Sequence, residues 1–165
     1  MQACAIAMAR CVMPDLLVKL YELPTIPSIA GVTIRRALAP ERHVVLDWVA
    51  RFFYPAWRSE CAVAFSQSPI SCIIAVEEQK LLGFACYDTT TRNFFGPTGV
   101  DPDCRGRGVG TALLVAALDA MKQLGYGYAI VGDAGPVEFY QRTVGAIVIP
   151  DSTPGVYRGM LQGDA

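Results

Sequence analysis

The sequence predicts one α/β domain in which a sheet is flanked by helices. Apolar runs of strand length alternate along the chain with segments whose apolar residues recur at helical spacing. The chain of 165 residues is long enough for one domain with a sizeable core. Hydrophobic residues make up 53% of it and charged residues only 18%. This apolar balance leads us to expect a homodimer that buries some apolar surface between its subunits.

The first half of the chain predicts an extension, one strand, two helices and a hairpin. Residues 1–30 are the expected N-terminal extension, partly strand or coil, and the domain proper is expected at 31–165. Pro40 suits the start of a helix, and a tight turn at 77–80 joins two apolar runs. The expected elements are a strand at 32–37, a helix that opens at 40–41, a second helix at 56–65, and hairpin strands at 71–76 and 81–88.

The second half is organised around residues 94–125, which predict a strand, a glycine-rich loop and a helix. Phe94–Val100 is aromatic and apolar, as a buried strand would be. Gly125 suits the C-terminal cap of the helix. The apolar residues at helical spacing are Leu113, Leu114, Ala117, Leu118, Met121 and Leu124. The remaining expected elements are strands at 126–131, 146–149 and 157–161 and a helix at 136–144.

The loop before this helix has the composition of an anion site. The first turn of a helix carries N–H groups without internal partners, and the macrodipole makes that end positive. Asp or Glu commonly occupies such a turn, but Arg105–Thr111 contains no acid and has two arginines. Glycines at 106, 108 and 110 let a ligand approach the backbone. We therefore expect an external anion, most plausibly a phosphate.

Three phosphate-binding motifs compete for this loop. A Walker loop requires a lysine before Thr111, and none is present. The dinucleotide fingerprint would start at Gly106, but it fails because Thr111 stands where it requires glycine and no acidic residue ends a strand about twenty residues on. The third pattern, Arg/Gln-x-x-Gly-x-Gly/Ala, matches Arg105–Gly110. With the strand before it and the helix after it, this segment resembles the coenzyme A pyrophosphate loop of the GNAT superfamily of N-acyltransferases.

The order of elements from Gly31 to Leu161 also resembles this superfamily, most specifically from Phe94 to Gly145. The resemblance implies the GNAT fold, a mixed and mostly antiparallel sheet flanked by helices. It implies an enzyme that transfers an acetyl group from acetyl-CoA, its cosubstrate, to an amine of a small molecule or protein. The alternative is a non-catalytic acyl-CoA-binding sensor or regulatory domain of the same fold. A nucleotide-binding module of another class is disfavoured by the two failed motifs.

The resemblance also assigns roles to individual residues. Backbone groups at Gly99 and Val100 are expected to pair with the pantetheine amides. Tyr140 is the expected acid that protonates the departing CoA thiolate; the alternative is a core tyrosine with a satisfied hydroxyl. Asp133 stands where the family often has an asparagine that contacts pantetheine, and a carboxylate accepts hydrogen bonds but cannot donate them. The expected pyrophosphate-binding residues are Arg105, Gly106, Arg107, Gly108, Val109, Gly110 and Thr111.

The general base and the acceptor site stay open. Phe94–Val100 has no carboxylate, so a glutamate base on the central strand does not carry over from the family. The candidate bases are Glu60, Asp88, Asp101 and a water chain, and each carboxylate has an alternative role on the surface or in a cap. Tyr54, Trp57 and Glu60 would form an aromatic and acidic pocket for an ammonium group, or else belong to the core and surface of a short amphipathic helix.

Charge and cysteine usage limit the other partners. The formal net charge of -1 gives no basic field for nucleic acid, and no apolar run reaches the length of a membrane span. Six cysteines without CxxC spacing and a single histidine, His43, predict no zinc site and no other metal. We expect reduced, mostly buried thiols in a cytoplasmic protein. Cys104 precedes the anion loop, where a positive surrounding would lower its pKa.

Overall fold

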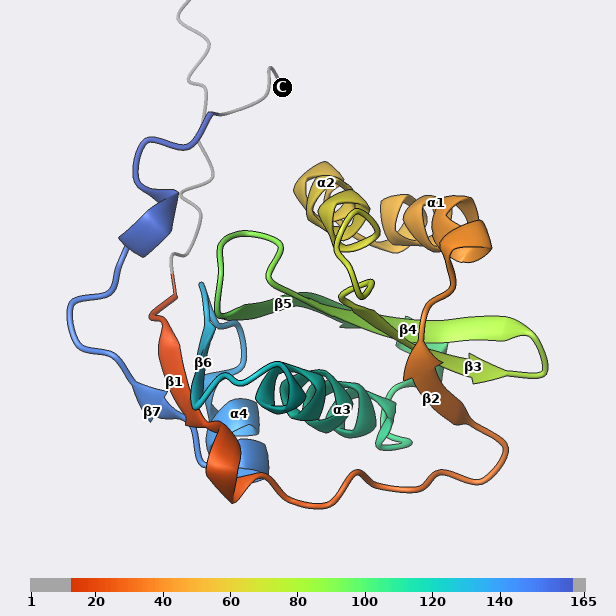
Figure 1. The fold of residues 1–165 in the computed structure, drawn as a ribbon, viewed down its shortest axis with the longest axis horizontal. Coiled ribbons are helices and arrows are strands. Elements are labelled where there is room, and N and C mark those ends of the chain that lie inside the picture. Colours follow the sequence, from red (N-terminus) through yellow and green to blue (C-terminus); the bar gives the residue numbers. More distant parts are fainter. Residues whose placement is uncertain (1–12, 162–165) are drawn as a thin grey trace, which may run out of the picture.

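A computed structural model describes residues 13–161, which form a seven-stranded sheet with helices on both faces (Figure 1). This confirms the predicted α/β class with a mixed, mostly antiparallel sheet. Cys4, Cys11 and the first twelve residues of the expected extension lie outside the described residues. Within the described range, no helix combines the length and apolar character that crossing a bilayer requires.

Apart from β1 and the strand expected at 157–161, the elements follow the predicted order with small shifts at their ends. The strands are β1 Leu16–Lys19, β2 Thr33–Arg36, β3 Cys72–Glu77, β4 Lys80–Tyr87, β5 Phe94–Val100, β6 Tyr128–Val131 and β7 Ile147–Val148. The α-helices are α1 Arg42–Phe52, α2 Pro55–Ala64, α3 Val109–Gln123 and α4 Val137–Val144. Short 3-10 turns cover Leu20–Glu22, Ala39–Glu41, Pro102–Cys104 and Gly155–Tyr157.

The strands lie in the order β2-β3-β4-β5-β6-β1-β7. Every neighbouring pair in the described sheet is antiparallel except β5 and β6. The parallel pairing is short, because Phe94 and Phe95 of β5 are its members, opposite Ile130 and Val131 of β6. Helix α3 connects these two strands, as a parallel pair requires.

Strand β1 lies inside the sheet, although it belongs to the expected N-terminal extension. It pairs along its whole length with β6, from Leu16 opposite Val131 to Lys19 opposite Tyr128, and on its other side with β7. Leu16, Val18 and the adjoining Leu20 have no exposed surface. Sequence analysis expected only an extension of strand or coil here, because the pairing partners of this segment lie more than a hundred residues away.

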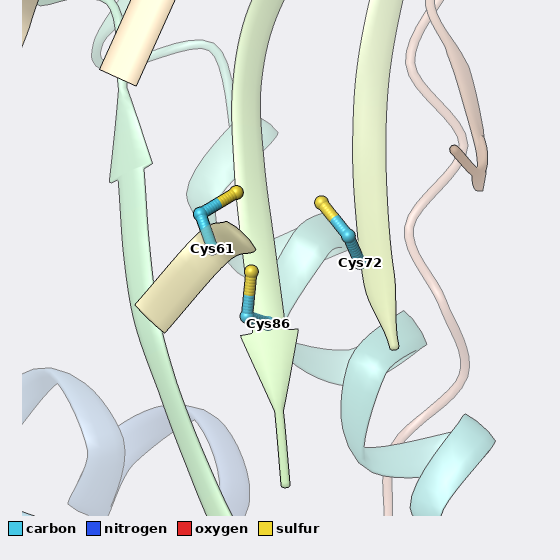
Figure 2. Close-up of side chains that lie close together, drawn as sticks. All are labelled: Cys61, Cys72 and Cys86. Atoms are coloured by element: carbon cyan, nitrogen blue, oxygen red, sulfur yellow. The ribbon is translucent and has the colours of Figure 1, made fainter. Parts of the chain in front are cut away.

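Helices α1 and α2 cover one face of the sheet (Figure 1). An apolar cluster fills the space beneath them and includes Val45, Leu46 and Val49 of α1 together with Phe84 of β4. Three cysteines, one from α2 and one each from β3 and β4, lie together within this cluster (Figure 2). The cysteines that the structure describes are all buried and free of disulfides.

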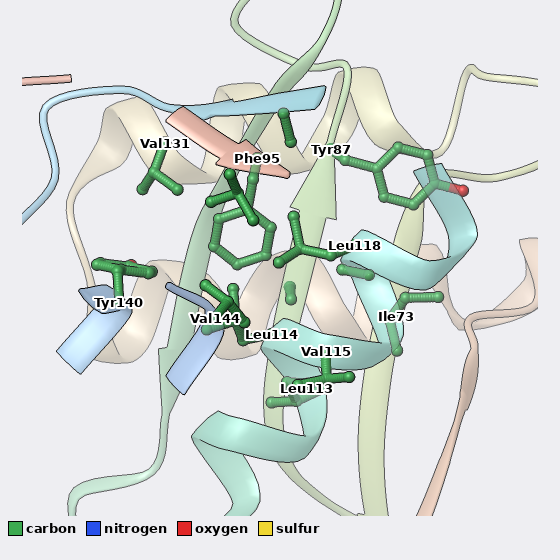
Figure 3. Close-up of a cluster of buried hydrophobic side chains, with 14 of the residues drawn as sticks. Ile73, Tyr87, Phe95, Leu113, Leu114, Val115, Leu118, Val131, Tyr140 and Val144 are labelled. Carbon is green, nitrogen blue, oxygen red and sulfur yellow. The ribbon is translucent and has the colours of Figure 1, made fainter. Parts of the chain in front are cut away.

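Helices α3 and α4 cover the other face, and the larger core lies beneath them (Figure 3). The predicted apolar stripe of α3 points into this core at all but its last position, Leu124, which follows the helix and is exposed. Gly125 has a φ of +97°, a left-handed conformation that suits the glycine predicted at the C-terminal cap. The buried members of the α3 stripe are Leu113, Leu114, Ala117, Leu118 and Met121.

The prediction of a closing strand at 157–161 is wrong. Gly155–Tyr157 forms a 3-10 turn and the residues after it are irregular. The β7 side of the sheet already ends with the two-residue pairing of Ile147 and Val148 with β1. The hydroxyl of Tyr157 lies close to Gly132, where an added Cβ would be 2.7 Å from it.

We expect β1 to stabilise the domain through its buried face. Leu16→Ala removes a fully buried side chain between β6 and β7, and should lower the free energy of unfolding by about 2–5 kcal/mol. Leu17→Ala, on the half-buried face of the same strand, is the matched control and should cost clearly less. Urea denaturation followed by circular dichroism measures both. Equal losses would mean that β1 contributes through its backbone pairing alone.

Candidate active site

The site begins where β5 and β6 separate. Phe95 is the last residue of β5 in the described parallel register, so the edge from Gly96 to Val100 continues without a strand beside it. On its other side β5 is bulged, because Gly96 and Pro97 together stand opposite the single residue Cys86 of β4. Proline also has no N–H to give to a neighbouring strand. The two carboxyl ends therefore diverge, the position at which α/β sheets commonly bind ligands.

A cleft of about 620 Å³ occupies this opening. Its walls come from α2, the β4–β5 loop, the second half of β5, the connection from β6 to α4, and the C-terminal segment. The lining residues used below are Trp57, Glu60, Thr90, Phe95, Thr98, Val131, Asp133, Tyr140 and Tyr157. The cleft is therefore large enough for the reacting end of an extended ligand and a second small molecule.

The glycine-rich loop follows directly on the unpaired edge of β5. Gly106 and Gly108 both adopt left-handed conformations, with φ of +77° and +82°, and Gly108 is the N-cap of α3. Open space surrounds the position of an added Cβ at Gly106, and the first turn of α3 contains no acidic residue. The backbone N–H groups of Val109 to Thr111 lie in the first turn of α3, and no side chain caps this helix start.

The side chains in and beside the loop differ in their contacts and in their exposure to solvent. Arg107 forms a bidentate ion pair with Glu77, at 2.6 and 3.2 Å, which ties the loop to the β3–β4 hairpin. Arg105 is exposed, whereas Val109 is buried in the main core and presents only its backbone to a ligand. Cys104 is also buried in that core, at 6% exposure, so it is not a surface nucleophile.

The β5 residues expected to contact pantetheine have their side chains committed elsewhere. A Cβ at Gly99 would lie 2.3 to 2.9 Å from ring atoms of Phe53, so glycine is required there for α1 to pack on the strand. Val100 packs against the main core. Their backbone groups on the β6 side remain at the open edge.

Tyr140 lies on the first half of α4 and lines the cleft from the side of the larger core (Figure 3). Its ring meets Phe95 and Phe139 edge to face, with centroids 6.3 and 5.2 Å away. Burial raises the pKa of Tyr140 to about 12. The phenol is consequently protonated throughout the physiological range and holds a proton that it can donate.

Asp133 also lines the cleft, but part of its carboxylate is already engaged. Oδ1 accepts a hydrogen bond from the backbone N–H of Met13 at 2.8 Å, and the Asp133 N–H donates to Asp15. The residue has a φ of +46°. Asp133 thus joins the N-terminal segment to the β6–α4 connection, a structural role that sequence analysis did not foresee.

Tyr157 is a cleft residue that sequence analysis missed, since it was assigned to a strand. Burial is the main cause that raises the pKa of Tyr157 to about 12, with smaller contributions from the carboxylates of Glu60, Asp15 and Asp133. The Pro-Gly turn before it was visible in the sequence, but nothing there indicated that the ring would return to the carboxyl end of β6.

Of the three residues considered for an acceptor pocket, two line the cleft and the third lies outside it. Trp57 and Glu60 line the cleft from α2, and Trp57 stacks on Phe53 with centroids 5.0 Å apart. Thr90 of the β4–β5 loop donates a hydrogen bond to Glu60 Oε1. Tyr54 touches Trp57 edge to face but is 68% exposed and outside the cleft.

The other two candidate bases serve as turn residues. Asp88 accepts hydrogen bonds from the Asn93 N–H and the Tyr126 hydroxyl, away from the cleft. Asp101, 5% exposed, caps the 3-10 turn before the glycine-rich loop by accepting from the N–H of Asp103. Among the described residues that line the cleft, the charged ones are Glu60 and Asp133, so its field is negative.

Comparison with solved structures shows the same fold in several proteins. A glucosamine N-acetyltransferase region of a fungal multi-domain beta-N-acetylglucosaminidase superposes with a TM-score of 0.66 at 18% identity, over 82% of this chain and 19% of that one. A GCN5-related N-acetyltransferase from Sphaerobacter thermophilus has a TM-score of 0.63 at 20% identity, and the match covers 82% of this chain and 48% of that one. A GCN5-related N-acetyltransferase from Kribbella flavida has a TM-score of 0.59 at 17% identity, and the match covers 82% of this chain and 54% of that one. No curated protein matches the chain.

This chain thus spans less than two thirds of each of these solved chains, and the identities support the fold alone. The sequence itself matches the model of the acetyltransferase (GNAT) family over residues 42–146, which runs from the start of α1 to the residue before β7. Strands β1, β2 and β7 lie outside the match. Because it covers most of the chain and includes the loop, α3 and α4, the protein belongs to the acetyltransferase (GNAT) family.

Proposed function

We propose that this protein is an N-acetyltransferase that moves the acetyl group of acetyl-CoA to a primary amine of positively charged character. Family membership supports acyl transfer in general. The observation that carries the finer proposal is the acid-lined cleft at the separation of β5 and β6, with a proton-donating tyrosine in its wall. The acyl-CoA sensor of the same fold is the alternative that the experiments below distinguish.

In this proposal the pyrophosphate of acetyl-CoA binds the N–H groups at the start of α3. The pantetheine arm follows the open edge of β5 toward the cleft. This edge, Gly96–Val100, is about 15 Å long at the usual rise per strand residue. Its free backbone groups would bond the pantetheine amides as a neighbouring strand would, which fixes the thioester beside the acceptor. Arg105 is free to reach the phosphates, whereas Arg107 supports the loop through Glu77.

The chemical step needs two proton transfers. The neutral amine attacks the thioester carbonyl, the carbon–sulfur bond breaks, and the thiolate takes the hydroxyl proton of Tyr140. The new amide loses one proton from its nitrogen. Glu60 is the cleft carboxylate proposed to receive it, directly or through water. Glu60 also holds the incoming ammonium group, which releases one proton to solvent before the attack, and Tyr140 regains a proton from solvent after the thiol leaves.

The acceptor class follows from the charges of the cleft. Two carboxylates and no lysine, arginine or histidine occur among its described lining residues. A cationic acceptor gains from this field, while an acidic one such as a dicarboxylic amino acid is repelled. Trp57 adds an aromatic surface suited to an ammonium or alkyl chain. We therefore propose amines with a second positive charge, or basic peptides, as preferred acceptors.

The cosubstrate site is tested by adding a charge to the loop without straining it. Gly110 is not in a left-handed conformation, and an added Cβ would make only ordinary contact with Val100 at 3.7 Å. Gly110→Asp places an acid in the first turn of α3, which favours the helix but repels a pyrophosphate. We expect CoA affinity, measured by calorimetry, to fall about tenfold to several hundredfold.

Gly110→Asn is the control of the same size without charge. It should retain most of the affinity, and both variants should keep the thermal stability of the original protein. If the asparagine and aspartate variants bind CoA equally well, the phosphates lie elsewhere.

The proton donor is tested by Tyr140→Phe, which keeps the buried ring and removes the hydroxyl. Turnover should fall about 10²–10⁴-fold while the Kd for acetyl-CoA changes little, because the hydroxyl acts as the thiolate departs. Tyr157→Phe removes a second hydroxyl of raised pKa from the same cleft and should cost much less. Release of free CoA over time provides kcat for each protein. Equal turnover in the Tyr140 variant and the original protein would assign Tyr140 to the core.

The acceptor class is tested with a panel of diamines, basic peptides, neutral amines and acidic amino acids. Glu60→Gln should raise the KM for the best cationic amine about five- to fiftyfold, as expected for loss of a charge-assisted hydrogen bond. Glu138→Gln, on the exposed surface of α4, is the control. A preference for acidic acceptors would contradict the charge argument. Tight acetyl-CoA binding without CoA release on any amine would instead favour the sensor.

A further inference from the structure

Three cysteine side chains point toward one another between α2 and the sheet (Figure 2). They are Cys61 of α2, Cys72 of β3 and Cys86 of β4, and their sulfur atoms all lie within 4.8 Å of one another. Cys72 and Cys86 are direct partners in the antiparallel register. Sulfur ligands of one metal ion at about 2.3 Å would be about 4 Å apart, so closing the triangle requires shifts below an ångström.

The surroundings of this cluster are dry and apolar. All three cysteines have no exposed surface, and their neighbours in the core include Val49, Ala64 and Phe84. Within the described part of the chain, no histidine or carboxylate joins the group as a fourth ligand. Structural zinc sites are almost always four-coordinate, and iron–sulfur clusters take four cysteines. Three thiolate-type ligands in an apolar pocket instead suit a soft cation of low coordination number.

The cost of burying charge points the same way. A site without exposed surface among apolar side chains favours a bound unit whose net charge is close to zero. One thiolate balances one monovalent cation, and this neutral unit has the lowest cost of burial. A divalent ion would require a second thiolate in the same apolar space.

We propose that Cys61, Cys72 and Cys86 form a binding site for copper(I), coordinated by three sulfur atoms. The site lies outside the acyl-transfer cleft, but Cys61 directly follows Glu60 of the cleft wall. A bound ion would link α2 to β3 and β4 and so fix the helix that carries Trp57 and Glu60. The inference does not depend on the proposed enzyme activity, because metal binding is measured without substrate.

The test uses the full chain with the other cysteines removed. The triple variant Cys4→Ser/Cys11→Ser/Cys104→Ala keeps only the three cysteines of the cluster. It is produced in cells supplemented with copper, because a buried site has to be loaded during folding. After purification under reducing, oxygen-free conditions with a bathocuproine disulfonate wash, we expect about one copper ion per chain. The melting temperature should exceed that of the copper-free preparation by several degrees.

Adding Cys61→Ala to this protein is the matched variant, because alanine favours the helix and removes one ligand. It should lose the copper and the melting-temperature difference while retaining CoA binding. X-ray absorption at the copper edge of the cluster-only protein should show sulfur neighbours alone, near 2.3 Å. This measurement decides the case even if the alanine variant fails to fold. Absence of copper, nitrogen or oxygen ligands, zinc in its place, or retention of copper after Cys61→Ala would each overturn the proposal.

Discussion

The arrangement of the site depends on the early end of the pairing between β5 and β6. A sheet normally continues until its strands end, and here the pairing stops at Phe95 although β5 runs on to Val100. The bulge at Gly96 and Pro97 accounts for this, since it turns the strand away and removes a donor. The unpaired backbone groups would be costly if buried without partners. An exposed strand edge next to a helix start without a side-chain cap is thus stable only with water or a ligand along it.

The two sides of this opening differ in the sign of their charge. In the proposed function, one side binds an anion and the other a cation. The start of α3 carries positive partial charge and has no acid in its first turn. The opposite end is bounded by Glu60 and Asp133. An elongated anion that carries a neutral reactive end fits the first side, and a cation fits the second. Tyr140 lines the same cleft as the two carboxylates, and burial keeps its hydroxyl protonated.

Sequence analysis succeeded where the signal is local. The glycine-rich loop, the stripe of α3 and its C-terminal Gly125 lie within one continuous segment, and each follows from the backbone needs of its own residues. Tyr140 was identified by the motif around it and does line the cleft, although its role as acid is still a prediction. What sequence analysis left open or missed depends on contacts between residues far apart in the sequence. Strand β1 acquires its partners from β6 and β7, and Tyr157 is defined by a return of the chain that no periodicity records.

The cysteine cluster shows how far local reasoning extends. The six cysteines show no CxxC spacing, and from this sequence analysis expected no metal site. Cys72 and Cys86, however, are partners only because a bulge between Ala75 and Val76 shifts the register by one residue from that of the hairpin turn, where Glu77 pairs with Lys80. The third sulfur arrives only through the packing of α2 on this face, which depends on the aromatic contacts of Trp57 with Phe53 and Phe84. The cluster therefore depends on a bulge in the hairpin and on the tertiary packing that also shapes the cleft.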